Sequence, residues 1–173
     1  LIANNGVDAT EKWAHRFVGN FARKPEGNDR AQIMAVANGE ADVAVANSYY
    51  IGLMLSGKKG EEQQAAARKV ELHFPGQDGR GAHINVSGAG LMKNAPNAGN
   101  AVKFIEFLLS EEAQSHIVNN TYEFPMLEGV APSDLIAQFG SGFKEDQTSV
   151  ASYGEFNPCL LYTSDAADEY SRG

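Results

Sequence analysis

A short run of small apolar residues, Val43 to Ala46, lies between two helical segments and is bounded on both sides by residues that end regular structure. Gly39 and Glu40 precede the run, and Asn47 and Ser48 follow it. A continuous apolar run of this length is typical of a strand in a parallel sheet that is covered on both faces, because neither side of such a strand meets water. The run therefore predicts a layered α/β domain.

Helical periodicity surrounds this run. A first helix is expected over residues 9–22, after the acidic cap Asp8 and with Glu11 three residues later. A second helix is expected to begin at a cap on Asp29 and to end near Gly39. Strands and helices alternate along the rest of the chain, which indicates an α/β class with a parallel-rich sheet flanked by helices. The further helices are expected at 49–55, 61–69, 98–109 and 111–119, and the further strands at 70–74 and 84–92.

Composition excludes several classes of function. The formal net charge is −8 and lysines and arginines do not cluster, so no nucleic acid partner is expected. No segment approaches the roughly 18 to 20 consecutive apolar residues of a membrane span. Cys159 is the single cysteine, so a disulfide within the chain, a zinc–thiolate site and an iron–sulfur cluster are excluded.

Two adjacent tyrosines, Tyr49 and Tyr50, follow the predicted strand after Asn47 and Ser48. In a doubly wound sheet, ligands bind beyond the carboxyl ends of the strands, and this segment lies there. A trivalent cation can deprotonate a phenol, whose ordinary pKa is about 10, and phenolate oxygen suits hard metals such as Fe(III). The alternative, that the two rings only open an amphipathic helix and pack against it, stays open at this point.

Signals for catalysis are weak. The four histidines show no metal-ligand spacing, and Gly88-Ala89-Gly90 lacks the third glycine of a dinucleotide fingerprint. Ser87 lacks the glycine that a nucleophile elbow needs two residues before the serine. The glycine-rich run over residues 76–81 could cradle an anion through its backbone N–H groups, but a surface turn explains it better. No set of nucleophile, base and orienting group is visible, so an enzyme is not expected.

Taken together, three stretches resemble the ferric-ion binding proteins of bacterial ABC iron importers, which have the type 2 periplasmic binding protein fold. The first ends in Asn47-Ser48-Tyr49-Tyr50 and the second begins with Phe74-Pro75-Gly76-Gln77. The stretches span residues 39–50, 74–90 and 100–110. The resemblance implies a protein that binds without catalysing and that delivers its solute to an ABC transporter permease in the inner membrane. It also implies a periplasmic monomer.

The same resemblance implies a ligand set. Tyr49 and Tyr50 match the paired tyrosines that donate phenolate oxygens to Fe(III). Asn47 matches the asparagine that, in some members, contacts a synergistic anion such as carbonate or phosphate. Asn28 or Asp29 is the expected counterpart of a polar residue that also approaches this anion.

The family's amino-terminal lobe, with its signal peptide and further ligands, has no counterpart here, so the chain is expected to be a carboxy-terminal portion. It is expected to divide into a lobe over residues 1–82 that carries the tyrosine pair, a crossover and segment of the other lobe over 83–130, and a return over 131–156. Residues 157–173, which include Cys159, have no clear period and are expected to be a non-native or disordered tail.

Two rival functions remain open. The first keeps the fold and changes the solute to thiamine, a polyamine, a phosphonate or another anion, none of which needs two adjacent phenolates. The second is a transferase that uses the 76–81 loop for phosphate.

Overall fold

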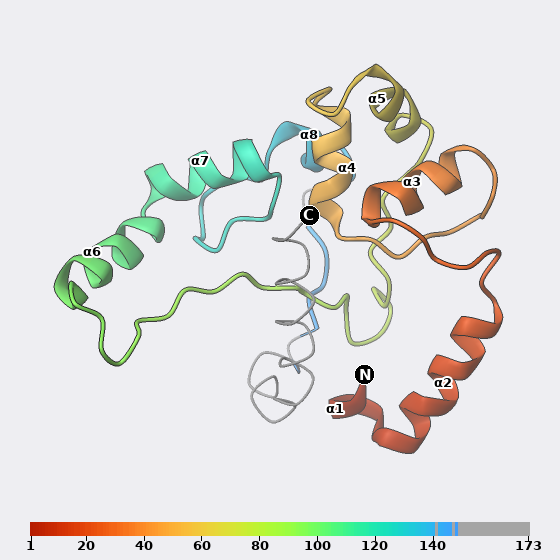
Figure 1. Ribbon diagram of the computed structural model, residues 1–173, viewed down its shortest axis with the longest axis horizontal. Helices are drawn as coiled ribbons and strands as arrows, with labels where there is room; N and C mark the ends of the chain where they lie inside the picture. Colours follow the sequence, from red (N-terminus) through yellow and green to blue (C-terminus); the bar gives the residue numbers. More distant parts are fainter. Residues whose placement is uncertain (141, 147, 149–173) are drawn as a thin grey trace. The chain divides into compact units, whose positions relative to one another are not determined.

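The computed structural model describes residues 1–140, 142–146 and 148 (Figure 1). No helix among them is long and apolar enough to cross a membrane. The helices in this part of the chain are α1 (Ile2–Asn5), α2 (Val7–Gly19), α3 (Asp29–Ala37), α4 (Ser48–Leu55), α5 (Glu61–Ala67), α6 (Ala98–Leu108), α7 (Glu111–Thr121) and α8 (Asp134–Ala137).

The chain divides into two compact units. The first unit contains Leu1–Phe21, Pro75–Ile84 and the described residues from Lys144 onward, and the second contains Ala22–Phe74 and Asn85–Phe143. The lobes expected over residues 1–82, 83–130 and 131–156 stay a prediction, and the predicted tail lies outside the described residues.

The second unit is organised around α4. This helix contacts α3, α5, α7 and α8, and Figure 1 shows it between α3 and α8. Met54 of α4 is fully buried, and burial of a side chain of this size contributes about 1.5–3 kcal/mol. The buried residues that form this core are Ile33, Ile51, Met54, Ala66, Ala67, Tyr122 and Ile136.

The helices that the sequence predicts in both units are confirmed, with small differences at their ends. The first begins at Val7 after Gly6, so Asp8 lies in its first turn and is not the cap. The helix predicted from a cap at Asp29 is capped instead by Asn28, whose side chain accepts a hydrogen bond from the backbone N–H of Ala31. Ser110 caps α7 in the same way, by accepting from the N–H of Ala113.

The structure corrects the prediction of a sheet. Residues 43–46, 70–74 and 84–92 have no strand assignment, and the one β-type pairing among the described residues is an isolated parallel bridge between Ala82 and Glu145 in the first unit. A strand is stabilised only when a neighbouring strand takes up its backbone hydrogen bonds. Val43 and Val45 are instead 81% and 76% exposed, and only Ala46 at the end of the apolar run packs against the core.

Asp146 joins the segments of the first unit. Its backbone N–H donates to the carbonyl of Ala82, and its carboxylate lies 3.0 Å from Nε of Arg80. A hydrogen bond from the backbone N–H of Thr148, its side-chain hydrogen bond and the Arg80 charge together lower the pKa of Asp146, against the opposing effect of burial. The carboxylate is therefore ionised at neutral pH.

Candidate metal site

The first turn of α4 carries Tyr49 and Tyr50. The helix is anchored further along by Ile51 and Met54, which are buried in the core of the second unit. The tyrosines are half-buried, and their ring centroids lie 4.5 Å apart with the planes tilted by 40°. Both rings also pack against the core. Packing and metal binding are therefore not exclusive, because the apolar part of a phenol can be buried while its oxygen stays accessible.

The electrostatic surroundings hold Tyr49 in its neutral form. Burial, a hydrogen bond with Tyr50 and the charges of Tyr50, Asp29 and Glu123 raise the pKa of Tyr49 to about 12. Each of these opposes a negative charge on the phenol oxygen. A cation that binds this oxygen must therefore displace a proton. The charge of a trivalent cation at this position shifts the equilibrium between phenol and phenolate toward the phenolate.

Asn47 is the N-cap residue of α4, and its hydrogen bonds lead to two other segments. Its backbone N–H donates to Oδ1 of Asp29 at 2.8 Å, and its side-chain Nδ2 lies 3.4 Å from the same oxygen. Its Oδ1 accepts from Nδ2 of Asn85 at 3.3 Å. Asn47 and Asp29, both predicted from the sequence, are thus brought together two residues before the tyrosine pair.

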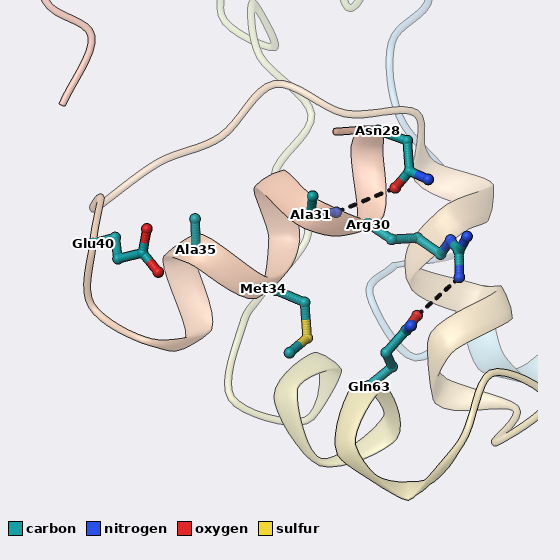
Figure 2. A pocket seen from close by; sticks show the side chains of 7 residues that line it. All are labelled: Asn28, Arg30, Ala31, Met34, Ala35, Glu40 and Gln63. Carbon is teal, nitrogen blue, oxygen red and sulfur yellow. Dashed lines mark hydrogen bonds between the residues drawn. The ribbon is translucent and has the colours of Figure 1, made fainter. Parts of the chain in front are cut away.

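Asn28, the third residue expected near an anion, faces a different feature. It lines a surface pocket of about 350 Å³ along α3 and α5, where its side chain caps α3 (Figure 2). In the same pocket Nη1 of Arg30 donates to Oε1 of Gln63 at 3.1 Å. Neither tyrosine lines this pocket.

Sequence reasoning missed two residues beside the pair. Glu123 interacts electrostatically with Tyr49, and its carboxylate accepts from Oγ1 of Thr121 at 3.0 Å and from Oγ of Ser87 at 3.4 Å. Asn85, which bonds to Asn47, is the other. Both are distant from Tyr49 in the sequence, so no local pattern linked them to the tyrosine pair.

Carboxylates, imidazoles and thiols do not form a metal site elsewhere in the described ranges, since no three such groups gather there. Among the histidines, His15 lies near the Glu11 carboxylate at 3.9 Å on the exposed face of α2. The paired phenols are therefore the metal-binding candidate that this part of the chain supports best.

Comparison with known proteins defines the class. The family model described as bacterial extracellular solute-binding protein matches residues 3–115. This match covers more than half of the chain, and the chain belongs to that family.

The similar curated proteins include iron-uptake and iron-binding proteins. The chain is 51% identical to Iron uptake protein A1 of Synechocystis over 154 residues, which is 89% of the chain and 42% of that protein. It is 33% identical to the major ferric iron-binding protein of Neisseria meningitidis, over 73% of the chain and 36% of that protein. The chain thus spans less than half the length of these relatives.

Solved structures agree on the fold. A Trichodesmium protein, IdiA or FutA, determined with iron and citrate ligands, matches with a TM-score of 0.85 and 46% identity, over 95% of this chain and 52% of that one. The ferric binding protein from Campylobacter jejuni matches with a TM-score of 0.83 and 41% identity, over 89% of this chain and 48% of that one. These matches give the chain the type 2 periplasmic binding protein fold.

Proposed function

We propose that the chain is part of a solute-binding protein that captures ferric iron and delivers it to an ABC transporter. The observation that carries the proposal is the pair of half-buried phenols, Tyr49 and Tyr50, side by side in the first turn of α4. Relatives whose names record iron uptake or ferric iron binding support it. The protein binds its solute without transforming it, as members of a solute-binding family do.

The pair provides two hard oxygen donors. Fe(III) displaces both phenolic protons and is held by two phenolates, a ligand type that suits a hard trivalent cation. The carboxylates of Asp29 and Glu123, which act on Tyr49, add negative potential that attracts a cation to this place. Two phenolates leave most of the coordination sphere of iron to other donors, which we assign to residues outside this chain.

The proposed ligand set also includes a synergistic anion such as carbonate or phosphate. The amide groups of Asn47 and Asn28 are its candidate partners. Asp29 carries a negative charge and already accepts hydrogen bonds from Asn47. We therefore place Asp29 behind Asn47, where it does not contact the anion directly.

The remaining parts of the proposal concern the cellular setting. The protein works as a periplasmic monomer, and an ABC permease in the inner membrane recognises it once iron has closed its two lobes. The chain corresponds to the carboxy-terminal portion, so closure requires polypeptide beyond these residues.

Titration with ferric citrate tests the iron assignment. Iron bound by tyrosinate gives a visible phenolate-to-iron charge-transfer band, and we expect Tyr49→Phe and Tyr50→Phe each to weaken it and the double variant to abolish it. Tyr122→Phe is the matched control, because Tyr122 is buried beside Ser56 and Lys58 in the same unit. The full-length protein should bind far more tightly than the chain alone, because a cleft site draws ligands from two lobes.

Iron binding that is unchanged in the double variant would end the assignment. Saturable binding of thiamine, a polyamine or a phosphonate, with no response to ferric citrate, would identify that compound as the solute in place of iron.

A further inference from the structure

The first turn of α4 begins without a cap of its own. Asn47 occupies the N-cap position in an extended conformation, but its side chain makes no hydrogen bond to the following helical turn. The amide side chain instead lies between Asp29 and Asn85. The position at which α4 begins therefore depends on partners from distant segments.

Asp29 is the most firmly placed of these partners. It is the first residue of α3, a helix whose Ile33 and Ala35 are buried in the core. The loop before α3 is tied to the helix because Nε2 of Gln32 donates to the carbonyl of Glu26 at 2.8 Å. Arg30, next to Asp29, is held by Gln63 of α5 (Figure 2). The Asp29 carboxylate is thus presented from a rigid support.

The hydrogen bond from the backbone N–H of Asn47 to Asp29 is short. Its N–O distance is 2.8 Å, and the oxygen belongs to a carboxylate in a half-buried position. The contact joins the N-terminal ends of α3 and α4 at a point two residues before Tyr49.

We infer that Asp29 is a positioning residue for the metal site, which holds Asn47 and thereby sets the first turn of α4 that carries Tyr49 and Tyr50. Asp29 acts through Asn47 and does not bind the metal. The inference rests on the proposed function, since it concerns the geometry of the same phenol pair. Residues that orient metal ligands typically change metal affinity by about 10–100-fold when they are removed.

Two conservative variants separate positioning from simple attraction of the cation. Asp29→Asn keeps an acceptor oxygen in the same place and removes the charge, whereas Asp29→Glu keeps the charge and moves the acceptor by one methylene. Positioning predicts that Asp29→Asn binds Fe(III) within about 3-fold of the original chain and that Asp29→Glu and Asp29→Ala lose about 10-fold or more. Simple attraction of the cation predicts the reverse order for the Asn and Glu variants.

The titration with ferric citrate is made on the chain and its variants, with the charge-transfer band recorded at saturation. A shifted band in Asp29→Glu but not in Asp29→Asn reports altered phenolate geometry, which a loss of stability alone does not produce. Asp134→Ala is the matched control, because Asp134 is likewise the first residue of a helix in the second unit but is exposed. The Fe(III) affinity and the charge-transfer band of Asp134→Ala should equal those of the original chain.

Hydrogen exchange in the metal-free chain gives a reading that does not depend on iron. The Asn47 amide should exchange faster in Asp29→Glu and Asp29→Ala than in Asp29→Asn, while the core amides of α4 stay protected. Equal Asn47 exchange in all variants, or the reverse order of iron affinities, would overturn the positioning role. Loss of the band in the tyrosine variants with no effect at Asp29 would also overturn it and leave the proposed function intact, whereas a band that survives in the double tyrosine variant refutes the proposed function itself.

Discussion

A Cβ atom placed on Gly52 would lie 2.6 Å from the Cβ of Tyr122, so α4 and the end of α7 approach each other more closely than any side chain at Gly52 would permit. Tyr122 itself ends α7 in the left-handed conformation, with φ at 65°. Its ring is buried and lies under the Nζ of Lys58, 5.2 Å from the ring centroid. Gly52 is therefore required for the packing of α4 against Tyr122.

Gly52→Ala should destabilise the second unit by about 1–3 kcal/mol, because the added methyl group forces α4 away from Tyr122. Gly99→Ala is the control, since Gly99 also lies in a helix but a Cβ there meets nothing within 4 Å. That change should stabilise the chain by about 0.5–1 kcal/mol through helix propensity. Urea unfolding of both variants checks the pair, and equal effects would contradict the packing argument.

The raised pKa of Tyr49 predicts a loss of stability in alkali. A group whose pKa is higher in the folded state contributes stability below its unfolded value, here 10.0, and that contribution disappears as the pH rises through about 12. The free energy of unfolding should therefore fall between these pH values in the original chain, and this part of the fall should be absent in Tyr49→Phe. Unfolding curves at alkaline pH measure it, and parallel slopes in the two proteins would contradict it.

The lowered pKa of Asp146 predicts the opposite dependence, in acid. Its contribution to stability is present above the ordinary value of 3.8 and is lost as the pH falls through the lower folded value. Asp146→Asn should remove this part of the acid sensitivity. Arg80→Ala should weaken it, because the Arg80 charge is one of the causes of the shift. Acid unfolding followed by circular dichroism tests both variants, and identical acid profiles in all three proteins would refute the role of this pair.

A group of three phenylalanines in the second unit gives a prediction about packing. Phe143 stacks on Phe74 with centroids 4.1 Å apart and planes within 5°, and Phe124 meets both rings at steep angles. In a double-mutant cycle, Phe74→Ala and Phe143→Ala should show a coupling energy of about 0.5–1.5 kcal/mol. Phe104 is 59% exposed on α6, and its change to Ala should alter stability by less than about 0.5 kcal/mol. A coupling energy near zero would mean that the stacking contributes nothing beyond the separate burial of the rings.

The sequence by itself was enough to predict helices α2 to α7, but not the short helices α1 and α8. Periodic apolar residues and a helix-ending glycine such as Gly39 act within a few residues of one another, so a local pattern contains them. The adjacent tyrosines after an apolar run were visible for the same reason. What the sequence determined about this protein is therefore its local structure and the nature of its candidate donor atoms.

Only the tertiary structure decided how these donors are held. Asp29 meets Asn47 across 18 residues, Asn85 meets Asn47 across 38, and Ser87 meets Glu123 across 36. No local pattern reports such contacts, because they arise when separate segments pack around one core. The strand predicted at Val43 to Ala46 was wrong for the same reason, since a strand depends on pairing with another strand, and a local apolar run cannot supply that partner.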